Sequence, residues 1–323
     1  TNPLLLSVRS GARVSMPGMM DTILNLGLND DVVEGLVAKT GNVKWVFDIY
    51  RRFIHMFGEV VQGVEYEAFA SVLEDIKVKN NYDSDLELNG DDWKNVSAQY
   101  LAIVEKETGK PFPSDPEEQL EMAVNAVFES WDTPRAVIYR NHNGIQHNWG
   151  TAVNVQEMVF GNISDKSGTG VLFTRNPKTG TKEIWGEFLF NAQGEDIVAG
   201  IRTPLKLEDL EKVSPAIYKE LTDILDNLEA HYKDMQDVEF TIEEGKLFLL
   251  QTRNGKRTGA AGIKIAVDMA NEGLLTREEA VASIDVNAVD QLLHPVFNLE
   301  ALEQAEVLTT GLAASPGAAS GKI

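Results

Sequence analysis

Residues 237–253 read DVEFTIEEGKLFLLQTR, and the first six of them alternate polar and apolar side chains. Such alternation predicts a strand with one polar and one apolar face, and the glycine that follows predicts a hairpin. Glu243–Gly245 can form a three-residue loop in which Gly245 adopts a left-handed conformation. That loop would pair Ile242 with Lys246 and set the register of the whole hairpin.

The predicted register sorts the side chains of this hairpin onto two faces. One face is a ladder of apolar residues: Val238, Phe240, Phe248 and Leu250. The other face carries four polar side chains: Asp237, Glu239, Gln251 and Arg253. Carboxylate and amide oxygens suit Mg²⁺, and an arginine can fork onto phosphate oxygens, so this face is a candidate site for a metal-chelated phosphate. The pattern alone also fits a solvated sheet face with an ordinary ion pair, and both interpretations stay open at this point.

The composition excludes several functional classes. The 323 residues carry 29 Lys and Arg against 50 Asp and Glu, a formal charge of −21, which argues against a general nucleic-acid-binding protein. The absence of cysteine excludes a disulfide scaffold, thiol catalysis and cysteine-bound zinc. Apolar residues make up 43% of the chain, enough for a large core, and no apolar run approaches the ~20 residues of a membrane helix. We therefore expect a soluble, cytoplasmic protein of roughly two domains, with a plastid or other organelle left open because both ends look like cuts through a longer chain.

The spacing of apolar residues changes along the chain in a way that predicts an α+β fold. Residues 4–8 form a short apolar strand candidate, and residues 30–131 show apolar side chains at helical spacing. From 135 to 200 strand and turn patterns take over, beginning with Ala136–Tyr139, which we predict to be a strand.

Capping signals mark several helix ends. Asp115 before Pro116 predicts the start of one helix, and Thr276 with Glu279 predicts a capping box at the start of another. A last helix is predicted to stop before Pro295.

Three weaker patterns could contribute to an anion site. Ser167–Gly170 lies at a predicted hairpin tip, where glycine lets backbone N–H groups approach an anion; the alternative is a simple turn. Arg9 follows the first apolar strand and is either a phosphate clamp or an ordinary surface arginine. Asn191–Asp196 places polar residues directly after a strand, where they either line a site or cap a helix. The five histidines show neither metal-ligand nor triad spacing, so none is assigned a catalytic role.

Several long segments resemble one family. The segments are 7–29 (SVRSGARVSMPGMMDTILNLGLN), 151–160 (TAVNVQEMVF), 167–177 (SGTGVLFTRNP), 191–204 (NAQGEDIVAGIRTP) and 235–258, which includes QTRNGKRTG. They resemble pyruvate, phosphate dikinase, and the resemblance extends over essentially the whole chain. It implies the N-terminal nucleotide-binding domain of that family, with an ATP-grasp-like fold and an inserted helical subdomain.

The resemblance also implies a division of the chain into parts. These are residues 1–28 with 114–160 as a first ATP-grasp subdomain lacking its N-terminal part, 29–113 as the inserted helical subdomain, 161–257 as the second ATP-grasp subdomain with the hairpin, 258–308 as a helical linker, and 309–323 as the start of a phosphohistidine domain.

In that family ATP binds between two subdomains, and a histidine on a separate domain attacks the β-phosphorus. AMP leaves, the γ-phosphoryl group passes to inorganic phosphate, and the phosphohistidine then converts pyruvate to phosphoenolpyruvate. The resemblance implies ATP contacts at Arg9, Gln156, Met158, Val159, Ser167, Gly168, Thr169, Gly170, Asp237, Glu239, Gln251 and Arg253. Of these, Glu239 and Gln251 are the implied ligands of Mg²⁺. Because the set includes the four side chains that alternation already groups together, the agreement favours the functional interpretation of the hairpin.

The implied partners are ATP and the phosphohistidine and pyruvate-binding domains of the same full-length chain, in a homo-oligomer, with no nucleic acid and no membrane. The phosphorylated histidine and the pyruvate site are not among these residues, so the chain alone is expected to be inactive in the full reaction. Two alternatives remain: a water dikinase of the phosphoenolpyruvate synthase type, and a non-catalytic nucleotide-binding or interaction module. The Met16–Met20 segment favours the phosphate-using enzyme over the water dikinase.

Overall fold

The computed structural model describes residues 3–198 and 203–289, together with residues 292, 300, 301, 304–307 and 309. Its mixture of helices and antiparallel sheets confirms the predicted α+β class. The predicted helix end before Pro295 and residues 310–323 of the predicted phosphohistidine segment lie outside the described residues. The chain divides into two compact units, of which the first comprises Thr1–Gly170, Leu189–Pro204 and Phe240–Leu249 and the second Val171–Phe188, Leu205–Glu239 and Leu250–Ile323.

Most helices of the first unit begin at a side-chain cap. Asn29, Asn42 and Asn89 each accept a hydrogen bond from a backbone N–H group of the first turn that follows. Asp115 caps its helix as predicted, with Pro116 at the first helical position. The helices are α1 (Asp30–Thr40), α2 (Val43–Val60), α3 (Tyr66–Asn80), α4 (Gly90–Thr108), α5 (Pro116–Glu129), α6 (Pro134–His142) and α7 (Gly194–Val198), with short 3₁₀ turns η1 (Asp85–Glu87), η2 (Ser130–Asp132) and η3 (His147–Trp149).

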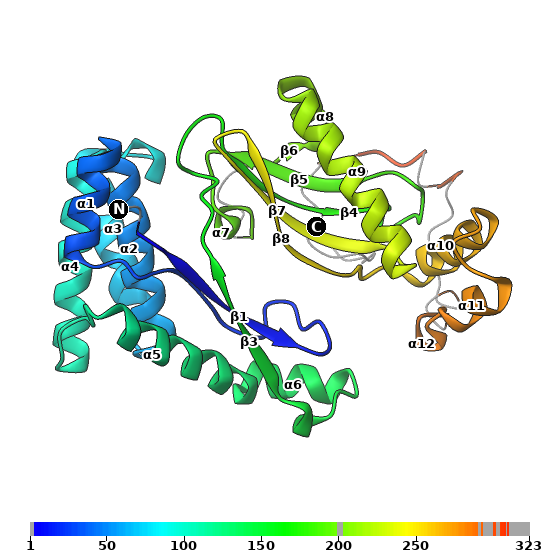
Figure 1. Ribbon diagram of the computed structural model, residues 1–323, viewed down its shortest axis with the longest axis horizontal. Helices are drawn as coiled ribbons and strands as arrows, with labels where there is room; N and C mark the ends of the chain where they lie inside the picture. The colour runs from blue at the N-terminus through cyan, green and yellow to red at the C-terminus, as the bar shows by residue number, and fades with distance from the viewer. Residues whose placement is uncertain are drawn as a thin grey trace. The chain divides into compact units, whose positions relative to one another are not determined.

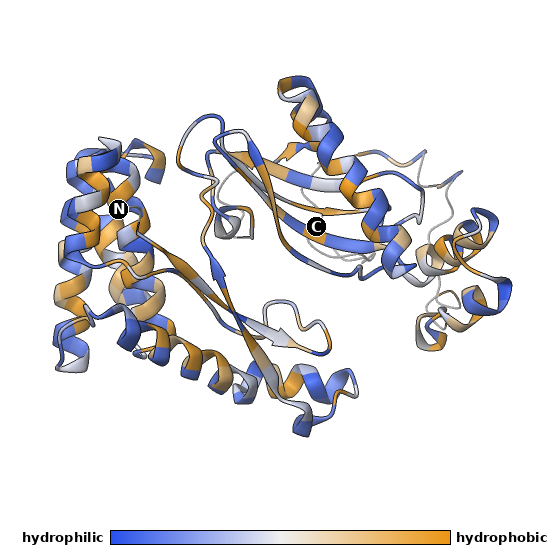
Figure 2. Ribbon diagram, in the orientation of Figure 1, coloured by the Kyte–Doolittle hydropathy of each residue, from blue (hydrophilic) through white to orange (hydrophobic). Residues whose placement is uncertain are grey.

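Helix α2 is the centre of the helical block. Its residues Ile49, Phe53 and Phe57 are fully buried and share one core with Val104 of α4. The ring of Phe53 lies 5.4 Å from that of Phe112, nearly at a right angle. Figure 2 shows apolar residues concentrated along these helices. The predicted apolar stripe of α2 is therefore core, as an amphipathic helix requires.

His55 is a half-buried titratable group at this core, with a side chain that is 21% exposed. Its ring lies against Phe69, Tyr66 and Tyr100, with centroid distances of 4.8, 5.4 and 5.8 Å. Burial, and to a lesser extent the positive charge of Arg51, lowers the pKa of His55 from 6.5 to about 4. The folded protein therefore holds this imidazole neutral at pH values where an unfolded chain would protonate it.

A lowered histidine pKa makes the folded state lose stability as the pH falls. The contribution of His55 is complete above the unfolded pKa of 6.5 and is lost as the pH approaches 4. We expect the His55→Gln variant, which cannot titrate, to lose about 2–3 kcal/mol less free energy of unfolding than the wild type between about pH 7.5 and about pH 4.5. Urea unfolding at both pH values measures the difference, and equal losses in the two proteins would contradict the assignment.

The first sheet belongs entirely to the first unit. It consists of β1 (Leu6–Ala12), β2 (Thr22–Leu26) and β3 (Thr151–Glu157) in the antiparallel order β2-β1-β3. Arg9 of β1 pairs in register with Thr22 of β2 and Asn154 of β3. The loop between β1 and β2 is held at its end by a 3.2 Å hydrogen bond from the Asp21 N–H to Ser130 Oγ. The predicted strands near residues 4–8 and 151–160 are thus confirmed, with shifted ends.

The predicted strand at Ala136–Tyr139 is wrong, because these residues lie in helix α6. A four-residue apolar run fits a helix and a strand equally well. Ala136 and Arg140, which are four residues apart, both turn to the buried side, as helical spacing demands. Arg140 anchors that side, since its guanidinium lies 4.1 Å from the centroid of the Trp131 ring.

The second sheet has the order β6-β5-β4-β7-β8, and its strands are shared between the two units (Figure 1). The strands are β4 (Gly168–Phe173), β5 (Trp185–Phe190), β6 (Leu205–Lys206), β7 (Gln236–Glu243) and β8 (Lys246–Asn254). The second unit adds the helices α8 (Leu207–Val213), α9 (Pro215–Tyr232), α10 (Gly259–Asn271), α11 (Arg277–Ala282) and α12 (Val286–Val289). Thr276 and Glu279 form the predicted capping box of α11. None of the helices in the described ranges combines the length and apolar character that crossing a bilayer requires.

The loop between β7 and β8 is shorter than predicted. β7 continues through Glu243 and β8 begins at Lys246, which leaves only Glu244 and Gly245 between them. Both loop residues have a positive φ, 50° and 81°, which is the backbone of a two-residue turn whose twist matches the flanking strands. Gly245 is left-handed as predicted. The predicted pairing of Ile242 with Lys246 is wrong, because a two-residue loop places Glu243 opposite Lys246 at the turn. Glu243 stays in the strand, where its carboxylate accepts a 2.6 Å hydrogen bond from the Phe160 N–H.

Candidate functional site

The polar face of the β7–β8 hairpin gathers its charged groups at one place. Arg253 Nε donates to Asp237 Oδ2 at 2.8 Å, and Arg253 Nη2 donates to Glu239 Oε1 at 3.1 Å. This fork requires all three side chains on the same side of the hairpin, as the alternation predicted. Gln251 precedes Arg253 by two residues in β8 and therefore shares its side of the strand.

Asp237 carries an unusual oxygen atom. Its Oδ1 is buried and has no hydrogen-bond partner among the described residues. Burial raises the pKa of Asp237, although the bond from Arg253 to the other oxygen opposes the shift. A buried carboxylate oxygen without a partner costs free energy. A cation or a hydrogen-bond donor bound at this face would therefore stabilise it.

The donor set of the hairpin fits a metal only when a ligand completes the coordination. In the described part of the chain, no group of three or more His, Cys, Asp or Glu side chains could hold a metal ion alone. Mg²⁺ bound with a nucleotide needs fewer protein ligands, since it typically takes one or two carboxylates plus phosphate oxygens. The carboxylates of Asp237 and Glu239, with the amide oxygen of Gln251, meet this smaller requirement.

The predicted hairpin tip at Ser167–Gly170 is wrong, because the strands before and after it, β3 and β4, belong to different sheets. The segment is also less open than predicted. The turn ends at Ser167, and the following glycine already begins β4. All four residues are buried, and Thr169 Oγ1 donates to the carbonyl of Phe240 at 3.1 Å. The Thr169 hydroxyl thus points into the sheet, because it satisfies a backbone acceptor of β7. A contribution of this segment to anion binding would come from backbone N–H groups.

The predicted contacts at Arg9, Gln156, Met158 and Val159 belong to the first unit, whereas the four polar side chains of the hairpin belong to the second. Arg9 is paired in register with Asn154 at the middle of the β1–β3 ladder. Met158 extends this ladder past the end of β3, since its N–H donates to the carbonyl of Leu5 at 2.9 Å. The contact of these residues with a nucleotide stays a prediction.

The Asn191–Asp196 pattern forms a helix cap, one of its two predicted roles. Asp196 Oδ2 accepts a 2.8 Å hydrogen bond from the Gln193 N–H at the start of α7. Its Oδ1 accepts from Arg52 Nη1 of α2 at 3.0 Å. This capping residue therefore also joins the segment to the helical block of the same unit.

Comparison with known proteins places the chain in a family. It matches the family described as "Pyruvate phosphate dikinase, AMP/ATP-binding domain" over residues 1–212 and 205–274. It is also 55% identical over 333 residues to pyruvate, phosphate dikinase of Rhizobium meliloti (strain 1021), covering 99% of this chain and 37% of that protein. The chain belongs to the pyruvate, phosphate dikinase family.

Two further relatives in this dikinase family are similarly close. The pyruvate, phosphate dikinase of Clostridium symbiosum is 55% identical over 323 residues, covering 100% of this chain and 37% of the relative. The chloroplastic pyruvate, phosphate dikinase of Mesembryanthemum crystallinum is 54% identical over 323 residues, covering 100% and 34%. The chain thus spans a little over one third of the length of these curated relatives.

One set of polar residues in this dikinase-family domain was missed in the sequence. Gln236 in β7 and Thr252 in β8 lie on the side of the hairpin that alternation assigned to an apolar ladder. Thr252 Oγ1 donates to Gln236 Oε1 at 3.1 Å, and Gln236 is only 1% exposed. Alternation along the strand could have revealed this residue. Gln236 is two residues before Val238, so its side chain points to the same, inward side.

Proposed function

We propose that this chain is the Mg²⁺-ATP-binding part of a pyruvate, phosphate dikinase. The complete enzyme would convert ATP, inorganic phosphate and pyruvate to AMP, diphosphate and phosphoenolpyruvate. The observation that carries the proposal is the hairpin face, where Arg253 lies 2.8 Å from Asp237 and 3.1 Å from Glu239 beside a buried, unpartnered carboxylate oxygen. The description of the matched family and the names of the relatives support the nucleotide and the reaction.

Different side chains of the hairpin would bind the metal and the phosphates of Mg²⁺-ATP. Glu239 and Gln251 would hold Mg²⁺, which supplies positive charge against the triphosphate. Arg253 would contact phosphate oxygens, and its bond to Asp237 orients the guanidinium before the ligand arrives. Such local cations matter here because the chain carries a formal charge of −21, which disfavours a polyanion elsewhere on the surface.

The remaining parts of the reaction would need other domains of the full-length protein. In the proposed scheme ATP binds with Mg²⁺ at the polar face of the β7–β8 hairpin. A histidine on a separate domain attacks the β-phosphorus and AMP leaves. Inorganic phosphate then accepts the γ-phosphoryl group as diphosphate, and the phosphohistidine passes its phosphoryl group to pyruvate.

The 323-residue chain alone is expected to form no AMP from ATP in the presence of pyruvate and phosphate. The chain corresponds to only 37% of the Rhizobium meliloti relative, and the proposed phosphoryl acceptor belongs to another domain. Chromatographic measurement of AMP tests this expectation against the full-length protein as a positive control. AMP formation by the short chain at the full-length rate would contradict it.

Isothermal titration with a non-hydrolysable ATP analogue tests the binding proposal itself. We expect heat of binding that requires Mg²⁺, because the metal screens the triphosphate at the acidic face. The absence of binding with and without Mg²⁺ would support a merely structural module. In the full-length protein, AMP formation that does not depend on inorganic phosphate would indicate a water dikinase instead.

A further inference from the structure

A polar network centred on the buried side chain of Gln236 lies on the side of the hairpin opposite the candidate site. Gln236 and Thr252 each neighbour a residue of that site in sequence, so their side chains point the other way. The amide N–H groups of Gln236 donate to the carbonyl of Asp234 at 3.0 Å and to Asn254 Oδ1 at 3.2 Å, and its oxygen accepts from Thr252 at 3.1 Å. Gln236 therefore links β7 with β8 through one amide donor and its acceptor, while the other donor bonds the Asp234 carbonyl just before β7.

Gln236 also links the hairpin to the neighbouring strand β4. Thr174, which directly follows β4, donates its N–H to the carbonyl of Gln236 at 3.0 Å. In return the N–H of Gln236 donates to Thr174 Oγ1 at 3.0 Å. The Thr174 hydroxyl donates onward to Glu229 Oε2 of α9 at 2.7 Å. All three residues are at least nine-tenths buried, with exposures of 1%, 7% and 5%.

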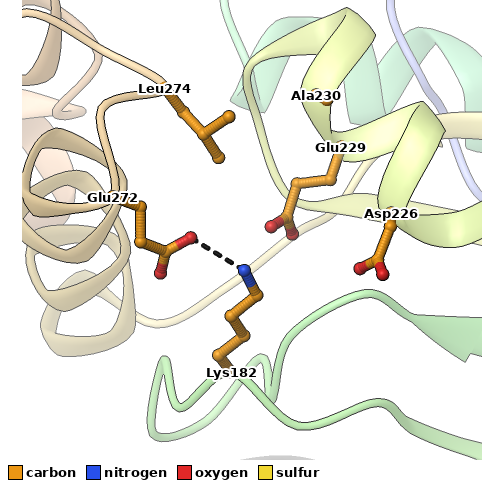
Figure 3. A pocket seen from close by; sticks show the side chains of 6 residues that line it. All are labelled: Lys182, Asp226, Glu229, Ala230, Glu272 and Leu274. Atoms are coloured by element: carbon orange, nitrogen blue, oxygen red, sulfur yellow. Dashed lines mark hydrogen bonds and ion pairs between the residues drawn. The ribbon is translucent and has the colours of Figure 1, made fainter.

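Arg175 anchors the far end of this network. Its side chain is fully buried and donates to Glu229 at 2.7 Å and to Glu272 at 2.8 Å. Figure 3 shows the carboxylates of Glu229, on α9, and Glu272, at the end of α10, beside a pocket, with the Lys182 amine bonded to Glu272. The pocket has a volume of about 460 Å³, and the bond from Lys182 to Glu272 is 2.9 Å long. The hydrogen bonds thus continue unbroken from the end of α10 to β8.

We propose that Gln236 and Thr252 are positioning residues for the nucleotide site on the other side of the hairpin. They hold β7 beside β8 so that Arg253 meets Asp237 and Glu239 and faces a metal-bound triphosphate. The inference rests on the proposed function. Its physical basis is that the buried amide of Gln236 finds its β8 partners in only one relative placement of the two strands, whereas an apolar pair tolerates sliding.

The geometry of the network favours positioning over simple stabilisation. A pair of apolar side chains at positions 236 and 252 would remove the need to satisfy buried polar atoms and would stabilise the hairpin as well or better. The polar pair instead fixes the direction of the Gln236 side chain. Its amide is bonded to Thr252 and Asn254 of β8 and to the Asp234 carbonyl just before β7. Asp237 and Arg253 are the next residues along each strand, so fixing Gln236 against Thr252 also fixes the positions of Asp237 and Arg253 on the opposite face.

The test compares three variants that differ in one hydroxyl or methyl group. Thr252→Val removes the hydroxyl donor at almost constant volume, and Thr252→Ser retains it. Thr222→Val is the matched control, because it removes a threonine hydroxyl that donates to the Lys219 carbonyl within α9 at 2.8 Å. Three readouts are measured: the affinity for Mg²⁺ with a non-hydrolysable ATP analogue, the melting temperature, and the side-chain Nε–H signal of Arg253 in ligand-free protein by NMR.

We expect Thr252→Val to bind the analogue about tenfold more weakly and to lose the slowly exchanging Arg253 Nε–H signal. Thr252→Ser and Thr222→Val should stay within about twofold of the wild type and keep the signal. Unchanged affinity and an unchanged signal in Thr252→Val would overturn the proposal, and so would a lower melting temperature without either change. If the wild type binds no nucleotide, the proposed function fails, while the Arg253 signal still decides whether Thr252 positions that side chain.

Discussion

Replacing Glu239 by glutamine is expected to weaken binding of Mg²⁺ with a non-hydrolysable ATP analogue by about 100-fold or more. The substitution keeps the shape of the side chain and removes one of the two carboxylates that Arg253 joins on the hairpin face. Arg253 would still be held by Asp237 at 2.8 Å, so the fold of the hairpin should persist. The affinity would fall because the metal needs a charged oxygen ligand to remain bound beside the phosphates.

The matched control is Glu244→Gln, which makes the same chemical change at the exposed turn of the same hairpin. Its affinity should stay within about twofold of the wild type, because an exposed charge at a turn is well screened. Isothermal titration of both variants against the wild type gives the comparison. Equal affinity of Glu239→Gln and Glu244→Gln would mean that the hairpin face does not hold the metal.

Replacing Arg175 by methionine is expected to lower the free energy of unfolding by about 3–5 kcal/mol. The guanidinium is fully buried and satisfies carboxylates on α9 and at the end of α10. Its removal leaves the charge of Glu229 buried without a cation, with the Thr174 hydroxyl still bonded to it. The bond from Arg175 is also the largest cause that lowers the pKa of Glu272, which means that the folded state prefers this carboxylate charged. Urea unfolding with linear extrapolation measures the change.

Lys182→Met provides the control for this prediction. Lys182 bonds the same Glu272 at 2.9 Å, but its side chain is 54% exposed, so its loss should cost less than about 1 kcal/mol. Arg175→Lys should fall between the two, since a lysine keeps the charge without the two-pronged geometry. A cost below about 1 kcal/mol for Arg175→Met would show that the buried network carries little of the stability of the second unit.

Local chemistry made part of this fold predictable from the sequence. The alternation in residues 237–242 predicted the side of the hairpin on which Asp237 and Glu239 lie, because side-chain direction in a strand depends on parity alone. The caps at Asp115 and Thr276 were predicted for a similar reason, since a capping side chain bonds to backbone groups within its own first turn.

Features that depend on a single backbone angle or on a short run were not predictable. The turn of the hairpin has two residues because Glu244, a non-glycine residue, adopts a positive φ of 50°, which its sequence does not demand. Ala136–Tyr139 is too short to show a period, and only its packing makes it helical. Gly168 begins a strand instead of extending a loop because β4 lies between β5 and β7 in the sheet.

The buried hydrogen-bond network behind the candidate site could not be predicted from the sequence, for a different reason. Arg175 reads as a surface arginine, since buried arginines are rare without partners. Its partners Glu229 and Glu272 lie 54 and 97 residues further along the chain. Only the assembled second unit brings them together. The residues that touch a ligand can thus be expected from pattern and resemblance, whereas those that position them depend on tertiary structure.

A crystal structure of the chain with Mn²⁺ and a non-hydrolysable ATP analogue would test the central claim most directly, because Mn²⁺ takes the oxygen ligands of Mg²⁺ and has an anomalous signal. The account predicts an anomalous peak roughly 2.0–2.5 Å from a carboxylate oxygen of Glu239 and from the amide oxygen of Gln251, with phosphate oxygens completing the coordination. A bound nucleotide whose metal lies away from the β7–β8 hairpin would contradict it.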